Sequence, residues 1–132
     1  MRELVIEPTG AACGAVVRGV ELRDLANDVA LTAAVRAAWL RHHVLVFPDQ
    51  SPTIEELERA ALAFGPFGED PYLRAIPDHP HVVEVRREAD EQSPVFAEAW
   101  HSDWSFLPVP PAGTLLHGVE IPPVGGDTLY AD

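Results

Sequence analysis

The sequence predicts one mainly β domain, a sandwich or barrel, with flanking helices. Two observations support this prediction. Short apolar runs separated by proline and glycine recur along the chain and dominate its last third, which is typical of short strands joined by tight turns. Two longer stretches have the apolar spacing of amphipathic helices instead. The length of 132 residues fits a single domain, residues 1–132.

The N-terminal third predicts short strands followed by a helix. Apolar runs at residues 4–6, 15–17 and 20–22, with glycines between them, are typical of strands joined by turns. Asp28 is a candidate N-cap, and the apolar residues after it recur at helical spacing. We therefore expect an amphipathic helix that ends near residues 41–42.

A second helix is predicted after a buried strand at residues 44–47, which Pro48 stops. Thr53 and Glu56 form the T-x-x-E pattern of a capping box, in which each side chain accepts a backbone N–H of the other residue. The apolar face that follows predicts a helix, and Gly65 predicts its end.

The rest of the chain predicts a loop and then further strands. Residues 71–80 are expected to form a loop, residues 82–85 a strand, and the charged run at 86–91 a solvated turn. More strands are expected in the last third, where proline and glycine separate the apolar runs. They are residues 100–106, 114–121 and 128–130.

The composition restricts the function classes and the cellular location. Hydrophobic residues make up 47% of the chain, enough for a core, whereas a net charge of −12 would repel phosphate backbones and anionic lipids. We therefore expect no nucleic acid and no membrane among the partners. Cys13 is the single cysteine, the N-terminus lacks a signal-peptide pattern, and no apolar run is long enough to span a membrane. A cytoplasmic location is the simplest expectation.

The stretch W-H-S-D-W-S-F contains a candidate catalytic and metal-binding pair, His101 and Asp103. Side chains at i and i+2 of a strand point to the same face, so the imidazole and the carboxylate could bind one metal ion. Together they would supply two of the three ligands of a 2-His-1-carboxylate triad, which leaves positions open on non-haem Fe(II). The pair alone is weakly specific, since a strand histidine hydrogen-bonded to a neighbour would give the same pattern.

Motifs after this pair make the pattern far more specific. W-H-S-D is followed by P-P-A-G at residues 110–113, an apolar run, a double proline, and G-G-D-T at residues 125–128. In order and spacing these motifs resemble the TauD/TfdA family of Fe(II)/2-oxoglutarate-dependent dioxygenases. The stretch L-R-H-H-V-L-V-F-P-D-Q, residues 40–50, is similar to the family's helix-to-strand junction. The resemblance therefore extends over nearly the whole chain.

The resemblance implies a double-stranded β-helix (jelly roll) with helices packed outside, Fe(II) as cofactor, and O2 and 2-oxoglutarate as co-substrates. Such enzymes convert 2-oxoglutarate to succinate and CO2 while they hydroxylate a small organic acid. His101 and Asp103 would be iron ligands, and Thr128 would hydrogen-bond a carboxylate of 2-oxoglutarate. Tyr72 would contact the substrate, and the acidic loop around it disfavours the sulfonate taurine.

The resemblance also implies that the sequence is the N-terminal half of such an enzyme and forms an incomplete jelly roll. In the family, the distal histidine of the triad and the arginine that holds the far carboxylate of 2-oxoglutarate both follow much later. We therefore expect residues 1–132 to be a dioxygenase domain truncated before its C-terminal half, with unpaired strand edges. The chain alone is expected to be inactive or poorly folded.

Several alternatives stay open at this point. The chain could be a non-enzymatic fragment or a half-domain that binds a partner through its open sheet edge, and it could assemble as a homo-oligomer. A zinc enzyme of the cupin type, with His101 and His117 as ligands, would need no 2-oxoglutarate. His79 and His81 form a weaker metal candidate, since a solvated loop explains this pair more simply.

Overall fold

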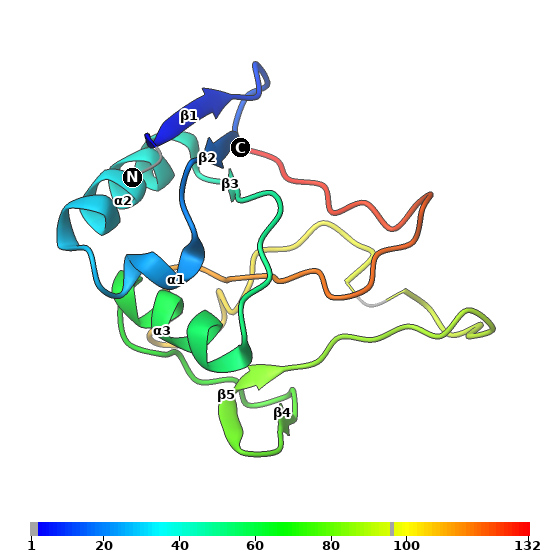
Figure 1. Ribbon diagram of the computed structural model, residues 1–132. Helices are drawn as coiled ribbons and strands as arrows, with labels where there is room; N and C mark the ends of the chain where they lie inside the picture. The colour runs from blue at the N-terminus through cyan, green and yellow to red at the C-terminus, as the bar shows by residue number, and fades with distance from the viewer. Residues whose placement is uncertain (1–2, 96) are drawn as a thin grey trace. The chain divides into compact units, whose positions relative to one another are not determined.

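The computed structural model describes residues 3–95 and 97–132, which form two compact units. The first unit comprises the described part of Met1–Pro66 together with Leu115–Asp132, and the second comprises Phe67–Thr114. The helices and the larger sheet belong to the first unit, and a β-hairpin belongs to the second (Figure 1).

The first unit is built on a three-stranded sheet in the order β1-β2-β3. β1 (Val5–Pro8) pairs antiparallel with β2 (Ala15–Arg18), which confirms two of the predicted strands. β3 (Leu45–Val46) runs parallel to β2, and the helices between them make the crossover that a parallel pair requires. Ala15 and Val17, two positions apart on β2, are both buried, so one face of the sheet meets the core.

Caps determine where the two long helices begin, and both helices were predicted. α2 (Val29–His42) starts after Asp28, whose carboxylate accepts a backbone N–H of the first turn at 2.9 Å. α3 (Ile54–Phe64) starts after Thr53, and both bonds of its capping box with Glu56 are present. Each cap stabilises its helix by about 1 kcal/mol, because it satisfies an N–H that has no acceptor within the helix. Of the helices in the described residues, none has the length and apolarity needed to cross a bilayer.

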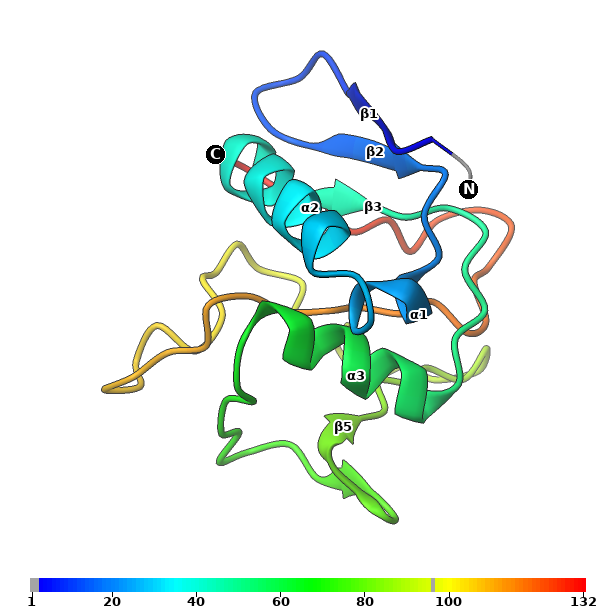
Figure 2. The same ribbon diagram turned by 60° about the vertical axis from the view of Figure 1, so that its left-hand side comes forward.

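The core of the first unit lies between the sheet and the helices. Its buried cluster consists of Val17, Val20, Leu25 and Val35. Figure 2 shows α2 running alongside the sheet, and α1 (Leu22–Leu25) lies next to α3. Arg36 on α2 donates a hydrogen bond to the Phe64 carbonyl at 2.7 Å, and the Trp39 ring meets the Phe64 ring edge-on at 5.8 Å. These contacts tie α2 to the C-terminal end of α3.

The strand predicted at residues 20–22 does not form, because the side chain of Gln50 takes the place of a strand neighbour. Val20 is buried in the core, and Leu22 begins α1. The Gln50 amide oxygen accepts the Leu22 N–H at 2.9 Å, and the Gln50 amide nitrogen donates to the Val20 carbonyl at 3.1 Å. The backbone groups that would otherwise need a neighbouring strand are therefore already satisfied.

In the second unit, β4 (Ala75–Ile76) and β5 (His79–Val83) form an antiparallel hairpin. The loop predicted over residues 71–80 is therefore wrong in its second half, and the strand predicted at 82–85 begins earlier. Pro77 and Asp78 make the turn, with Asp78 at φ 64, a left-handed conformation that aspartate tolerates. A Pro-Asp pair between two short strands was the turn signal that the prediction missed.

The three strands predicted in the last third do not form. In the described residues no strand follows Val83, and residues 103–106 make a turn instead. A strand requires a neighbour to pair its backbone groups, and an apolar pattern cannot supply that neighbour. The apolar side chains are left exposed, to 89% for Val119 and 71% for Trp100. The described residues thus form small sheets and helices, with no closed barrel.

Gly19→Ala should destabilise the first unit. Gly19 has a φ of +78, and a Cβ there would lie 2.0 Å from the Glu3 carbonyl oxygen, so the backbone would have to move. We expect the free energy of unfolding, measured by urea denaturation, to fall by about 2 kcal/mol or more. Gly10→Ala is the matched control, because Gly10 has a φ of +80 but nothing within 4 Å of the added Cβ. Equal losses in the two variants would contradict the steric explanation and leave only the cost of the left-handed backbone.

Candidate functional site

The structure brings the predicted metal pair together. The Nε2 atom of His101 lies 3.0 Å from Oδ1 of Asp103, and each side chain is about half exposed. The two side chains converge although the segment is not a strand. The chain turns directly after the pair, and Trp104 at φ 46 adopts a left-handed conformation that is rare for a bulky residue. The convergence was predicted, but the strand geometry given as its cause was wrong.

A hydrogen bond to the backbone orients the His101 ring. Its Nδ1 lies 2.8 Å from the Ala99 carbonyl oxygen, so Nδ1 carries hydrogen and Nε2 faces Asp103. The Ala99 carbonyl raises the pKa of His101, and the Asp103 carboxylate raises it further, because both stabilise the protonated ring. A proton on Nε2 would lie between the two side chains, which is the position that a metal cation would take in its place.

The donor set of this pair fits a first-row transition metal ion. A neutral imidazole nitrogen and a carboxylate oxygen are ligand types of the Fe(II) facial triad. Both atoms face the same space, so one ion could contact both. The separation of Nε2 and Oδ1 is 3.0 Å. Within residues 3–95 and 97–132, no group of three or more His, Cys, Asp or Glu side chains is arranged to hold a metal ion. On its own the pair could therefore supply at most two of the three ligands of such a triad.

The second oxygen of the Asp103 carboxylate has a partner that the sequence prediction missed. The Thr114 hydroxyl donates to Oδ2 of Asp103 at 3.2 Å. Thr114 directly follows the P-P-A-G motif, and was assigned only to an apolar strand. The signal that could have found it is a hydroxyl residue directly after the P-P-A-G motif, 11 positions from Asp103.

Asp70 connects the loop of Tyr72 to the turn that follows the metal pair. Its Oδ1 accepts the N–H groups of Tyr72 at 2.7 Å and Leu73 at 2.8 Å, and the Trp104 side chain contributes, as the smallest cause, to lowering the pKa of this carboxyl. The Leu73 N–H, followed by the Tyr72 N–H, lowers the pKa of Asp70 because each donor stabilises the ionised form. The Tyr72 ring also meets the Phe106 ring edge-on, with centroids 5.6 Å apart.

Thr128 is an exposed residue outside any helix or strand, and it belongs to the first unit, whereas His101 and Asp103 belong to the second. The two glycines before it, Gly125 at φ 80 and Gly126 at φ 74, are both left-handed. That conformation explains why glycine stands at both positions of the G-G-D-T motif, whether or not a ligand binds there.

The other histidine pair has a structural explanation. His79 and His81 lie on β5, rather than in a loop, and the His81 ring stacks on Phe67 with centroids 4.2 Å apart. Side chains two positions apart on a strand share a face, but the stacked ring of His81 already packs against an aromatic partner.

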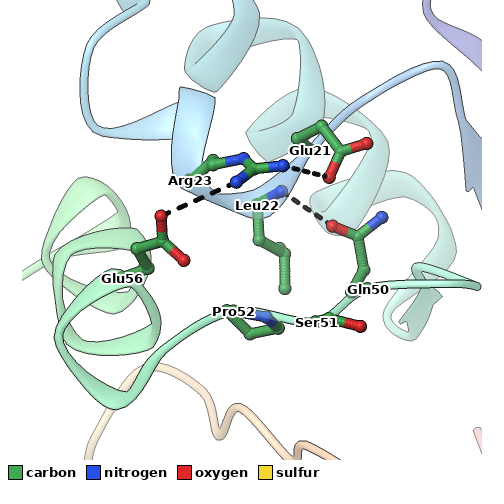
Figure 3. Close-up of a pocket in the computed structure, with 7 residues that line it drawn as sticks. All are labelled: Glu21, Leu22, Arg23, Gln50, Ser51, Pro52 and Glu56. Atoms are coloured by element: carbon green, nitrogen blue, oxygen red, sulfur yellow. Dashed lines mark hydrogen bonds and ion pairs between the residues drawn. The ribbon is translucent and has the colours of Figure 1, made fainter.

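A small hollow in the first unit is lined by Glu21, Leu22, Arg23, Gln50, Ser51, Pro52 and Glu56 (Figure 3). Its volume of about 10 Å³ is close to that of one water molecule. Arg23 lies 3.5 Å from the Glu21 carboxylate and 3.9 Å from the Glu56 carboxylate, and Gln50 bonds the Leu22 N–H. The polar groups of the hollow therefore join α1 to its neighbours and leave no room for a substrate.

Comparison with known proteins points to one family. A family model described as "Taurine catabolism dioxygenase TauD, TfdA family" matches residues 6–132. The (S)-phenoxypropionate/alpha-ketoglutarate-dioxygenase of Sphingobium herbicidovorans is 37% identical over 131 residues, covering 96% of this chain and 44% of that protein. An alpha-ketoglutarate-dependent sulfate ester dioxygenase of Pseudomonas putida is 29% identical, covering 98% of this chain and 42% of its own length. The chain thus spans less than half the length of these curated relatives.

A solved structure of another dioxygenase also resembles this chain. A taurine dioxygenase from Burkholderia xenovorans superimposes with a TM-score of 0.54 and 31% sequence identity. The match covers 64% of this chain and 31% of that protein.

Protonation of Asp70 should loosen the Tyr72 loop. Because its folded pKa is lowered, the carboxylate stabilises the loop above the pKa of an ordinary aspartate, and this contribution is lost as pH falls through the lowered value. We expect the amide NMR signals of Tyr72 and Leu73 to shift with a midpoint below that of an ordinary aspartate. Asp70→Asn is the control, since its neutral amide oxygen accepts the same N–H groups without titrating. A midpoint that persists in Asp70→Asn would contradict the assignment.

Proposed function

The chain belongs to the TauD/TfdA family, and from this membership we propose that it is the metal-binding part of an Fe(II)- and 2-oxoglutarate-dependent dioxygenase. The observation that supports this best is the convergence of His101 Nε2 and Asp103 Oδ1 at 3.0 Å. In the family sequence pattern, these residue types occupy the W-H-x-D segment that supplies two iron ligands. The reaction consumes O2 and 2-oxoglutarate, and it yields succinate, CO2 and a hydroxylated organic acid.

Each residue of the site has a defined task in this proposal. His101 would bind Fe(II) through Nε2, with its ring held by the Ala99 carbonyl, and Asp103 would bind through Oδ1. Bound Fe(II) would supply the oxygen chemistry, for which 2-oxoglutarate provides two electrons as it loses CO2. Thr128 would donate its hydroxyl to a carboxylate of 2-oxoglutarate, as a short side chain with one donor can.

The substrate class we propose is a small organic acid that carries an aromatic ring. Tyr72 and Phe106 form an edge-to-face pair that is largely exposed, at 77% and 60%, in the same unit as the metal pair. Exposed aromatic faces of this kind favour contact with another ring. The name of the Sphingobium relative, which specifies phenoxypropionate, agrees with such a substrate. Tyr72 would contact the substrate directly, and Phe106 would hold the Tyr72 ring in place.

We further propose that residues 1–132 form the N-terminal portion of a jelly-roll dioxygenase domain. The exposed apolar residues of 114–121 and 128–130 would then pair with strands that this chain does not contain. The relatives' greater length supports this view. Because two ligands hold iron weakly, the 132-residue chain alone should release no succinate from 2-oxoglutarate.

A chimera tests the metal ligands. Residues 1–132 would replace the matching N-terminal 44% of the Sphingobium relative, which keeps its own C-terminal part. Succinate release with (S)-phenoxypropionate, O2, Fe(II) and 2-oxoglutarate is the measurement. Because loss of a direct ligand costs more than loss of an outer partner, His101→Ala and Asp103→Ala should each lower the rate more than about 100-fold.

Two variants serve as matched controls for the chimera. His117→Ala removes a histidine, and Asp90→Ala removes an exposed carboxylate, neither of them in the proposed site. Both should keep the rate within about twofold, because they change side chains away from the proposed machinery. Activity that survives in His101→Ala or Asp103→Ala would refute the assigned ligands. Loss of activity in His117→Ala would mean that the assigned site lacks a residue that the reaction needs.

Thr128→Val should weaken binding of 2-oxoglutarate to the same chimera. A hydrogen bond to a charged group contributes roughly 1.5–3 kcal/mol, so we expect the Kd for 2-oxoglutarate to rise about tenfold or more. Calorimetric titration with Fe(II) present and O2 absent measures this Kd. Thr128→Ser, which keeps the hydroxyl, should restore most of the affinity. An equal loss in Thr128→Ser would mean that the methyl group matters rather than the donor.

A further inference from the structure

We propose that Thr114 is a positioning residue for the metal-binding carboxylate. Its hydroxyl would hold Oδ2 of Asp103, so that Oδ1 stays directed at the position it shares with His101 Nε2. The inference rests on the proposed function, because it takes Asp103 as a metal ligand. The two distances that support it are 3.2 Å from the Thr114 hydroxyl to Oδ2 and 3.0 Å from Oδ1 to Nε2.

An exposed aspartate needs such a partner to hold its carboxylate in one plane. The terminal torsion of an aspartate is broad, so the plane of a carboxylate without partners varies widely. The Asp103 side chain is half exposed, and packing therefore does little to hold it. A donor on Oδ2 fixes the plane of the carboxylate, because a carboxylate turned out of that plane would lose either that bond or its alignment with the histidine.

The two candidate ligands then have matching supports. His101 is held from outside the site by the Ala99 carbonyl on Nδ1, and Asp103 is held by the Thr114 hydroxyl on Oδ2. Metal ligands in proteins commonly have partners of this kind, which fix ring orientation and carboxylate rotation. Each support leaves the atom that faces the other ligand available for the ion.

Thr114 is well placed to act as a fixed donor. Pro110 and Pro111 lie four and three positions before it, and proline restricts the backbone of that segment. Pro111 lies against Gly68, where an added Cβ would come within 2.9 Å of the Pro111 Cβ. The threonine side chain itself is stiff at χ1 because it branches at Cβ. A stiff side chain on a held segment keeps the hydroxyl aimed at Asp103.

The test measures metal affinity of the 132-residue chain rather than turnover. Mn(II) binds the same oxygen and nitrogen donors, and its paramagnetism broadens the NMR signals of nearby residues. Titration would follow the amide signals of Ala99 and His101, which separates this site from other Mn(II) binding on an acidic chain. We expect Thr114→Val to weaken Mn(II) binding at these signals about tenfold, the lower end of the range for outer partners of ligands.

Three comparisons make the result specific to positioning. Thr114→Ser keeps the hydroxyl and should bind within about twofold of the unchanged chain. Thr114→Val in an Asp103→Ala background should cause no further loss, since the hydroxyl acts through Asp103. Thr32→Val removes a different threonine hydroxyl, one that donates to the Leu25 carbonyl, and should leave the Mn(II) affinity unchanged.

The outcomes separate this proposal from the proposed function. Equal affinity in Thr114→Val and the unchanged chain would overturn the positioning role, and so would an equal loss in the Asp103→Ala background. If Asp103→Ala and His101→Ala leave the broadening at Ala99 unchanged, the metal pair itself is wrong and the role of Thr114 falls with it. The role would be established if Thr114→Val weakens Mn(II) binding tenfold, Thr114→Ser does not, and Thr114→Val has no further effect in the Asp103→Ala background.

Discussion

Pairing of backbone polar groups is the constraint that organises this chain. In the first unit, the backbone of β2 hydrogen-bonds β1 on one side and β3 on the other. The Gln50 side chain accepts the Leu22 N–H and donates to the Val20 carbonyl at the start of α1. In the second unit, the Asp70 carboxylate does the same for two N–H groups of the Tyr72 loop. Buried or structured backbone must be paired, and here two polar side chains do what further strands would do elsewhere.

The candidate site follows the same rule, with one carboxylate shared by two partners. Asp103 faces His101 through Oδ1 and Thr114 through Oδ2, so both oxygens of its carboxylate have a partner. The Ala99 carbonyl and the Asp103 carboxylate both raise the pKa of His101, and the protonated ring offsets the negative charge of Asp103. A divalent cation would take over that role and bind both groups more strongly, because it carries more charge and accepts both lone pairs.

The sequence predicted the features that depend on neighbouring residues, such as the starts of the two long helices. Asp28 and the Thr53–Glu56 capping box marked the starts of α2 and α3, because a cap depends on residues within one turn. The strands after residue 100 were predicted wrongly, since an apolar pattern does not supply a partner for pairing. The W-H-S-D motif predicted that His101 and Asp103 would converge, and the structure shows that a turn and a left-handed Trp104 bring them together. Thr114 was missed because a single side-chain hydrogen bond leaves no periodic pattern in the sequence.

The contacts that orient His101 and Asp103 join residues close together in the sequence. This explains how a chain less than half the length of its relatives can form the pair. Ala99, His101 and Asp103 lie within five consecutive residues, and Thr114 is 11 positions from Asp103. Closing such short loops costs little conformational entropy compared with assembling a sheet from distant strands. The orientation of these two ligands can therefore form before a third ligand arrives. In the proposed dioxygenase, a third ligand from the rest of the protein would supply the affinity for iron that two ligands lack.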